Sequence, residues 1–117
     1  MKRPTVTVFA IIYATTYFSL INGATLINET ENTIEVRYEQ HRFTPNKIEV
    51  RAGRPLVLTI TNASAERIEF ESFKLNREKV ITPGETLVLR FPALREGAYD
   101  FYDDFHQDVP EGVIRAR

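Results

Sequence analysis

Apolar and polar residues alternate along most of this chain with a period of two, the period of a β-strand that buries one face. The first clear example is 34–38, where Ile34, Val36 and Tyr38 alternate with charged residues. The pattern predicts strands over 34–38, 48–50, 55–61, 67–71, 86–91, 98–102 and 112–116. Clusters of Gly, Pro, Asn and Ser separate these segments, as is typical of turns.

Seven or so short strands with no convincing helix indicate an all-β fold, and their spacing of about 8–12 residues is typical of a two-sheet sandwich. Segment 72–82, SFKLNREKVIT, is predicted to be a loop or a short strand. The sequence contains no internal repeat and no low-complexity segment.

The N-terminus departs from this pattern. Lys2 and Arg3 precede an apolar run over 6–21, and Asn22-Gly23-Ala24 follows it, which is the pattern of a secretory signal peptide. An uncleaved membrane anchor is the alternative, because the run approaches the length that spans a bilayer. We therefore expect 1–24 to be a signal peptide or N-terminal anchor, 25–33 a polar tether and 34–117 the folded domain. Either interpretation predicts export.

Charge and cysteine content exclude several functions. The chain has 15 basic and 16 acidic residues, and loss of residues 1–24 would leave 13 basic residues and a charge of −3. The basic residues are scattered and the dense patch is acidic, so a nucleic-acid binder is not expected. The sequence contains no cysteine, which excludes disulfides, thiolate metal ligands and a cysteine nucleophile.

Carboxylates and imidazoles occur two residues apart at or near predicted strand ends. The pairs are Glu39 with His41, Glu69 with Glu71 and Asp104 with His106, which Asp108 follows at the same interval. Because residues i and i+2 of a strand project to one face, these side chains could meet at one pole of the sandwich. Such ligands suit iron, manganese, zinc or Cu(II), whereas the missing thiolate disfavours Cu(I).

A simpler interpretation is that these acids are solvated surface residues. Outward glutamates on strands pair with arginines across the sheet, for a few tenths of a kcal/mol. His41 can equally hydrogen-bond a loop carbonyl. Both interpretations stay open for Glu69, Glu71 and His41, whereas the acid-rich turn around His106 favours a site.

Two longer stretches resemble the cupredoxin family. HRFTPNKIEVRAGRPLVLTITN, residues 41–62, resembles the first half of a cupredoxin, and REGAYDFYDDFHQDVPEGVIRAR, residues 95–117, resembles its last hairpin with the copper-binding loop. In this comparison Asp103 stands where the copper-binding cysteine would be, His106 matches the loop histidine, and Glu69 falls close to the upstream histidine. The resemblance implies a Greek-key β-sandwich, and loss of the cysteine and methionine ligands excludes blue-copper electron transfer.

The middle of the chain resembles a narrower group, the EfeO-type cupredoxin-like domains of bacterial ferrous-iron uptake. Its shared motifs are E-F-E-S at 69–72, N-R-E-K at 76–79 and F-H-x-D at 105–108 after an acidic residue. The sequence departs from that group at Asp104, where a glutamate is expected, and at the exit VPEG. A shorter acid would retract one ligand by about a methylene.

The resemblance implies a periplasmic protein that binds iron or copper for a ferrous-iron uptake system. It would deliver metal to a membrane iron permease or assist its redox chemistry, with other periplasmic uptake components as partners and weak Fe(II) oxidation as an open possibility. The protein would contact the membrane only through its N-terminal segment, if that segment is not cleaved. The alternative function is a metal-free β-sandwich that serves as an interaction or scaffold module.

The expected metal ligands form two groups. The first consists of Glu69, Glu71, Asp104 and His106. The second, which would bind metal or orient the residues that do, consists of His41, Glu78, Asp103 and Asp108.

Overall fold

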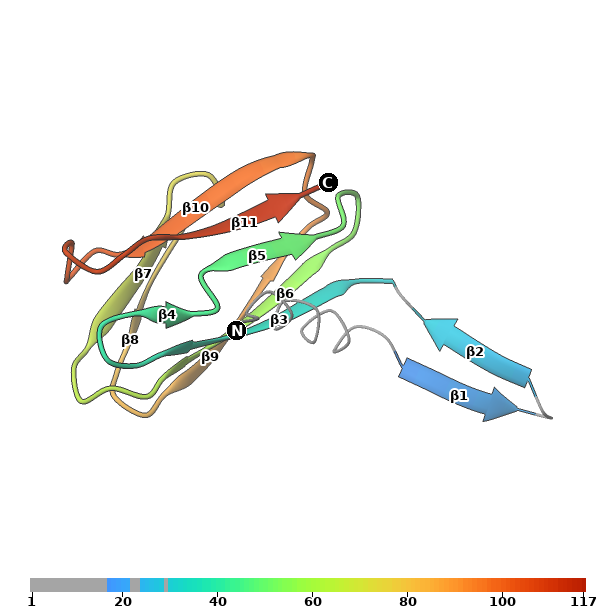
Figure 1. Cartoon of the computed structure of the whole chain (residues 1–117), viewed down its shortest axis with the longest axis horizontal. Coiled ribbons are helices and arrows are strands. Elements are labelled where there is room, and N and C mark those ends of the chain that lie inside the picture. Colours follow the sequence, from blue (N-terminus) through green and yellow to red (C-terminus); the bar gives the residue numbers. More distant parts are fainter. Residues whose placement is uncertain (1–16, 22–23, 29) are drawn as a thin grey trace, which may run out of the picture.

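The computed structural model describes residues 17–21, 24–28 and 30–117, and within them every regular element is a strand. β1 (Tyr17–Ile21) and β2 (Ala24–Asn28) form a separate antiparallel hairpin beside the larger sheets (Figure 1). The expected signal peptide or anchor lies mostly outside the described residues. The described part contains no helix that is long and apolar enough to cross a membrane.

The rest of the described chain forms two mixed sheets, which confirms the predicted all-β sandwich (Figure 1). The four-stranded sheet has the order β4-β3-β6-β9 and the five-stranded sheet the order β5-β11-β10-β7-β8. The strands are β3 (Asn32–Tyr38), β4 (Phe43–Thr44), β5 (Lys47–Val50), β6 (Leu56–Asn62), β7 (Ile68–Ser72), β8 (Arg77–Ile81), β9 (Thr86–Phe91), β10 (Gly97–Asp103) and β11 (Gly112–Ala116).

Each predicted strand segment coincides with a strand of the sandwich, which contains two further strands, and the hairpin β1–β2 was not predicted either. β8 lies within 72–82, where a loop or short strand was expected, and β4 is a two-residue strand that pairs with the end of β3. β3 begins at Asn32, two residues before the expected start of the domain. One parallel pair occurs in each sheet, β3 with β6 and β5 with β11.

Aromatic side chains fill the space between the sheets near one end of the sandwich. Phe43 packs edge-on against Tyr38 and Phe101, with ring centroids 5.0 and 5.1 Å apart, and Phe70 lies 5.4 Å from Phe101. All four rings are fully buried or nearly so. Edge-to-face pairs of this kind add about 0.5–1.5 kcal/mol each beyond the area that they bury. They give the loops above them a rigid base.

Three loops meet at this end, which lies on the left in Figure 1: the turn 39–42 after β3, the loop 63–67 after β6 and the loop 104–111 after β10. The turn 39–42 is closed by a hydrogen bond of 3.0 Å from the Glu39 amide to the Arg42 carbonyl. Gln40 and His41 within it adopt left-handed backbone conformations, with φ of 54° and 58°. We call this end of the sandwich the loop pole.

Asn62, which is fully buried at the end of β6, fixes the second of these loops. Its side-chain amide donates to the carbonyls of Glu66 and Ile81, at 2.7 and 2.9 Å. Its side-chain oxygen accepts hydrogen bonds from the backbone amide and the hydroxyl of Ser64. Each hydrogen-bonding group of the buried Asn62 side chain therefore has a partner. The same hydrogen bonds set the path of 63–67.

Close packing of Gly112 against Phe101 gives the first prediction. A Cβ at Gly112 would lie 2.1–2.7 Å from three carbons of the Phe101 ring, which faces it across the β10–β11 pair. We expect Gly112→Ala to destabilise the domain by about 1–3 kcal/mol, the usual cost of overpacking a core. The shift of the urea midpoint measures this effect.

The double variant Gly112→Ala/Phe101→Leu serves as the control. A smaller side chain at 101 removes the clash, so the two substitutions should cost less together than the sum of the single variants. Additive losses, or an unchanged midpoint for Gly112→Ala, would contradict this account of the packing.

Candidate metal centre

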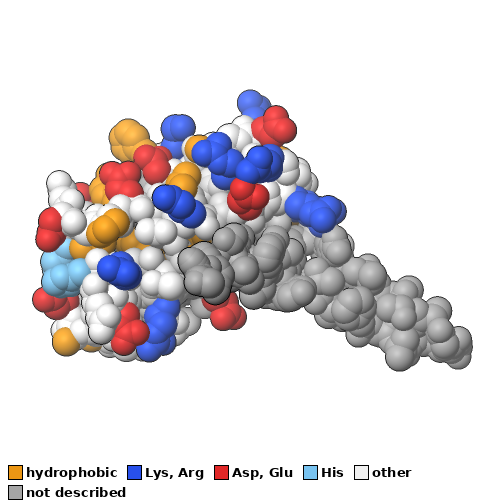
Figure 2. All heavy atoms as spheres, in the orientation of Figure 1, with side chains coloured by type: hydrophobic (Ala, Val, Ile, Leu, Met, Phe, Trp, Pro, Cys, Tyr) orange, Lys and Arg blue, Asp and Glu red, His pale blue; other side chains and the backbone are white. Residues whose placement is uncertain are grey.

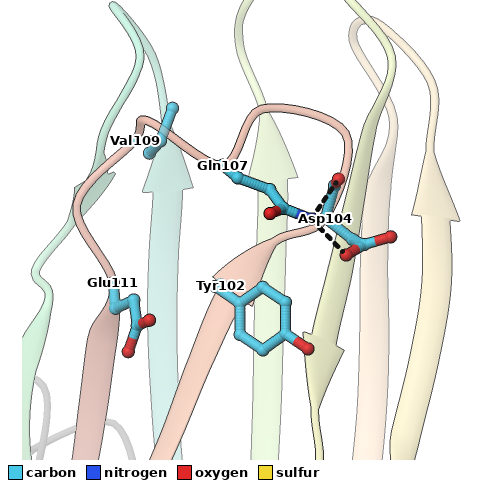
Figure 3. Close-up of a pocket in the computed structure, with 5 residues that line it drawn as sticks. All are labelled: Tyr102, Asp104, Gln107, Val109 and Glu111. Atoms are coloured by element: carbon cyan, nitrogen blue, oxygen red, sulfur yellow. Dashed lines mark hydrogen bonds between the residues drawn. The ribbon is translucent and has the colours of Figure 1, made fainter.

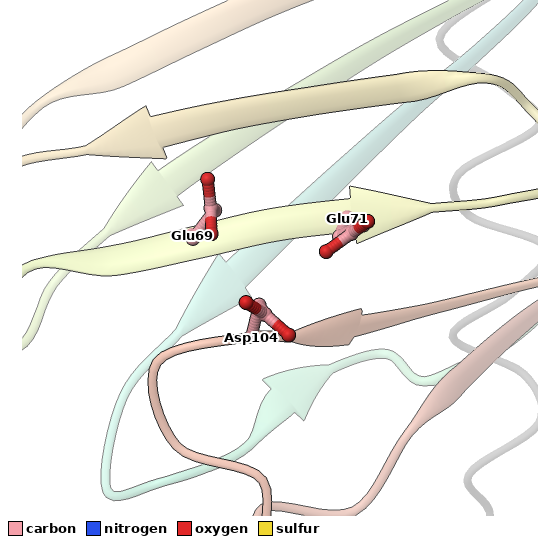
Figure 4. A group of neighbouring side chains, drawn as sticks. All are labelled: Glu69, Glu71 and Asp104. Atoms are coloured by element: carbon pink, nitrogen blue, oxygen red, sulfur yellow. The ribbon is translucent and has the colours of Figure 1, made fainter.

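Three carboxylates converge on the outer face of the five-stranded sheet (Figure 4). Because strand β7 buries Ile68 and Phe70, its alternate residues Glu69 and Glu71 face outward and are half-buried. Asp104 directly follows β10, the neighbour of β7, and its amide donates to the Glu69 carbonyl at 2.9 Å. One oxygen from each of the three carboxylates lies within 4.8 Å of the others. We call Glu69, Glu71 and Asp104 the carboxylate trio.

Glu78 adds a fourth acid beside the trio. It pairs with Glu71 across the β7–β8 ladder, and its carboxyl group lies close enough to Glu69 for the two to share a proton. Burial raises the pKa of Glu69, and the Glu78 hydrogen bond and the negative charges of Glu78, Asp104 and Glu71 raise it further. Carboxylates crowded in this way repel one another, and a bound cation reverses that repulsion.

Tyr102 and Gln107 border the trio on the side of the loop 104–111. Tyr102 faces Glu71 in the β10–β7 register, and partial burial together with the charges of Glu71 and Asp104 raises the pKa of its phenol. Gln107 donates to the Asp104 carboxylate at 3.0 Å and thereby orients it. Figure 3 shows the pocket that these residues line, together with Val109 and Glu111.

His106 is not part of the trio, because both of its ring nitrogens face other carboxylates at the loop pole. Nδ1 lies 2.7 Å from Asp103 Oδ2, and Nε2 lies 2.9 Å from Glu66 Oε1. The Asp103 side chain is fully buried, and its other oxygen accepts hydrogen bonds from the backbone amides of Glu69 and Phe105, at 3.0 and 3.1 Å. Asp103 therefore holds His106 in one orientation.

His41 approaches the same oxygen from the other side. Its Nε2 lies 3.5 Å from Glu66 Oε1, and its ring stacks on that of His106 with centroids 5.8 Å apart. Figure 2 shows the histidines in pale blue at the end of the molecule, with acidic side chains around them. We call His41, Glu66, His106 and Asp103 the pole cluster.

Tyr38 lies beneath the pole cluster with its hydroxyl fully buried. Burial raises the pKa of this phenol far above its ordinary value, and the carboxylate of Asp103 is the second cause. Although the two groups interact, the hydroxyl has no hydrogen-bond partner of normal geometry within the described residues. The Tyr38 phenol therefore stays neutral. It supports the pole cluster from below without adding a charge.

The residues expected from the sequence thus divide between two places. Glu69, Glu71 and Asp104 come together with Glu78 beside them, whereas His106, His41 and Asp103 lie in the pole cluster. Asp108 is an exposed residue of the loop 104–111 and belongs to neither group. Glu69, Glu71, Asp104 and His106 were expected to form a single site. In the structure the three acids form the all-oxygen trio, whereas His106 lies in the mixed pole cluster.

Glu66 is the one member of the pole cluster that was not expected. It lies in a loop, where the period-two argument gives no direction for a side chain, and the family comparison pointed to Glu69 instead. A usable signal was present, because Glu66 follows the buried strand end at Asn62 within four residues. That loop must lie at the same pole as the histidine-bearing loops.

The two groups differ in the ions that they suit. The trio offers only carboxylate oxygens, which hard cations prefer, whereas the pole cluster offers imidazole nitrogens as well. The chain contains no cysteine, and its single methionine is residue 1, outside the described residues. Neither group can therefore supply the copper–thiolate bond of a blue-copper centre.

The chain is similar to known proteins in sequence and in fold. The chain is 35% identical over 98 residues to an uncharacterized protein of Rickettsia prowazekii (strain Madrid E), covering 84% of this chain and 78% of that protein. The metal-binding domain of the Cu(I)-exporting P-type ATPase CopA from Streptococcus pneumoniae D39, solved with Cu(I), superposes with a TM-score of 0.66 at 20% identity, over 86% of this chain and 92% of that one.

Auracyanin from Roseiflexus castenholzii gives a TM-score of 0.62 at 17% identity, over 73% of this chain and 96% of its own. At these identities the superpositions show a shared fold and carry no ligand over to this chain. The family assignment comes from the sequence itself, because residues 7–116 match the family model of the cupredoxin-like domain. The chain therefore belongs to the cupredoxin-like domain family, within which it has no cysteine for a blue-copper site.

Proposed function

We propose that this domain binds iron as a cargo ion through Glu69, Glu71 and Asp104, and delivers it to a membrane permease in a periplasmic ferrous-iron uptake system. The observation that carries the proposal is the convergence of the three carboxylates within 4.8 Å. They come from a strand and from the end of its neighbour, so the sheet itself fixes their separation.

The donor atoms support iron over soft ions. Oxygen ligands suit hard and borderline cations, and the absence of sulfur disfavours Cu(I). Several cations suit oxygen ligands. Among them, iron is favoured because 69–72, 76–79 and 105–108 resemble the EfeO-type domains. Cu(II) is the second candidate, since copper-binding domains share this fold.

The exposure of the trio supports carriage over storage or electron transfer. Its three residues are only half-buried, so a bound ion would keep coordination positions open toward solvent. An open site exchanges its ion more readily than an enclosed one, and an acceptor protein can reach it. Glu78 offers a further carboxylate beside the site, through which an ion could be passed along the sheet.

Substitution of a single ligand tests the site directly. We expect Glu71→Gln and Asp104→Asn each to raise the Kd for Fe(II) at least tenfold, about 1.4 kcal/mol, because each removes one anionic oxygen from the trio. Isothermal titration calorimetry under anaerobic conditions measures the Kd for Fe(II) in each protein. The matched control is Glu35→Gln, an exposed outward glutamate on β3. Equal affinities in all four proteins would exclude the trio as the site.

Stabilisation by metal separates this function from a metal-free scaffold module. An ion that binds only the folded state at 100 times its Kd adds about 2.7 kcal/mol to the free energy of unfolding. We therefore expect Fe(II) to raise the Tm of the wild-type chain anaerobically and a chelator to reverse the increase. A Tm that neither treatment changes would favour the scaffold function.

The raised pKa of Glu69 predicts a pH-dependent effect in the metal-free protein. Its pKa lies above the ordinary 4.5 in the folded state, so the folded protein holds this proton more tightly than the unfolded chain. Stability from this group is then present at low pH and is lost as the pH rises through the raised pKa. With chelator present, Glu69→Gln should raise the Tm at pH 7 and have little effect below pH 4.5.

Glu35→Gln again provides the control, because Glu35 is an exposed glutamate on another strand. Its Tm difference from wild type should be small at both pH values. A difference for Glu69→Gln that is equal at the two pH values would show that proton binding at residue 69 is not coupled to folding.

A further inference from the structure

We propose that the end of the sandwich opposite the loop pole is a docking surface for the anionic headgroups of a phospholipid membrane. We call this end the basic end. It consists of the segments outside the strands that lie there, which are 30–31, 51–55, 73–76, 92–96 and residue 117. The proposal goes beyond iron binding and does not depend on it, because no residue of the trio belongs to this surface.

Charged side chains are divided unequally between the two ends of the sandwich. Four connections at the loop pole together contain six acidic residues and two arginines, whereas the basic end contains five basic residues and two acids. The connections at the loop pole are 39–42, 63–67, 82–85 and 104–111. The basic residues of the basic end are Arg51, Arg54, Lys74, Arg95 and Arg117, and its acids are Glu31 and Glu96.

Hydrogen bonds join the segments of the basic end into one surface. Two amides of 51–55 donate to the carbonyls of Arg117 and Leu94, at 3.3 and 2.8 Å. Nζ of Lys74 donates to the carbonyl of Ala98, 3.3 Å away near the start of β10. The basic side chains therefore lie on neighbouring segments, although they are far apart in the sequence.

Asn32, the buried first residue of β3, holds the segment 51–55 in place. Its backbone amide donates to the Pro55 carbonyl at 2.8 Å, and its side-chain amide donates to the Arg51 carbonyl at 3.0 Å. Its side-chain oxygen accepts a hydrogen bond of 3.1 Å from the Arg51 amide. These bonds use only the backbone of Arg51, so the guanidinium is left exposed on a fixed loop.

Three cations of the basic end are available to an anion. Arg51, Lys74 and Arg95 are exposed, and within the part of the chain that the structure describes none of them has an acidic partner. Arg117, by contrast, is paired with Glu49. An anionic headgroup can therefore approach these three side chains without breaking an existing ion pair.

Phe73 adds an apolar contact beside these cations. It is 82% exposed, more than any other large hydrophobic residue that the structure describes, and it precedes Lys74 in the turn 73–76. The Ser72 hydroxyl fixes this turn, because it accepts the Leu75 amide at 3.1 Å and donates to the Asp100 carbonyl at 2.7 Å. An aromatic ring next to basic side chains suits the membrane interface, where the ring enters the headgroup region and the cations meet phosphates.

The course of the chain favours a membrane over an acidic protein as the partner. β3 begins at the basic end, so the N-terminal part of the chain joins the sandwich there (Figure 1). In the sequence of that part, the apolar run 6–21 follows Lys2 and Arg3. An apolar segment combined with a basic patch is a pair of signals that holds proteins stably at anionic membranes. The acidic loop pole would be repelled by the same surface and would point away from it.

Vesicle binding of the full chain tests the proposal. Partition coefficients are measured by flotation with vesicles of phosphatidylcholine alone and of equal parts phosphatidylcholine and phosphatidylglycerol. We expect the wild type to prefer the anionic vesicles, and added salt to weaken that preference by screening exposed charges. Arg51→Gln/Arg95→Gln should lower the preference about 30-fold, which corresponds to about 1 kcal/mol for each basic side chain near such a surface.

The matched control is Arg42→Gln/Arg67→Gln, which removes the same two positive charges at the loop pole and should keep the wild-type preference. All three proteins retain the N-terminal segment, so they should bind the neutral vesicles equally. A wild type without preference, or an equal loss in the two double variants, would overturn the basic end as the docking surface. Binding to poly-glutamate without a preference for anionic vesicles would overturn the membrane as the partner in favour of an acidic protein.

The absence of tryptophan from the chain allows a second test, of orientation. Phe73→Trp places a fluorescent ring at the basic end, and Phe105→Trp places one at the loop pole, where Phe105 is 44% exposed. We expect anionic vesicles to shift the emission of Phe73→Trp to shorter wavelength and to leave that of Phe105→Trp unchanged. A shift at residue 105 alone, or none at residue 73, would overturn the proposed orientation.

Discussion

The loop pole depends on one buried carboxylate, that of Asp103. One of its oxygens accepts hydrogen bonds from two backbone amides, one in β7 and one in the loop after β10, and so closes the end of β10. Its other oxygen holds His106. A buried charge is costly unless it is fully hydrogen-bonded. Asp103 meets that condition, with three donors around it and the neutral phenol of Tyr38 below. Strand pairing, loop path and the orientation of His106 are thus tied to the same side chain.

Most of the fold could be predicted from the sequence, because burial on one face of a strand imposes a period of two that is readable without coordinates. Ile34, Val36 and Tyr38 illustrate this, since all three are buried in β3. The two strands of the sandwich that the pattern did not establish are those with little such signal. β4 has only two residues, and three of the five residues of β8 are exposed.

The candidate sites could be predicted only within strands and directly at their ends. Glu69 and Glu71 share a face because of their spacing, and Asp104, the first residue after β10, joins them. The position of His106 could not be obtained in this way, because a loop residue has no fixed alternation and its direction is decided by Asp103. Glu66 was missed for the same reason. What positions it is the side chain of Asn62, which holds the Glu66 carbonyl through a contact that the alternation of residues does not reveal.

Asp103 and Asp104 are adjacent in the chain, yet one carboxylate supports the pole cluster and the other belongs to the trio. A single peptide unit therefore connects the buried carboxylate that orients His106 with an outward-facing carboxylate of the trio. If an ion draws Asp104 outward, the shift reaches Asp103 through the covalent backbone. A change on the outer face of the sheet would in this way be transmitted to the loops at its end.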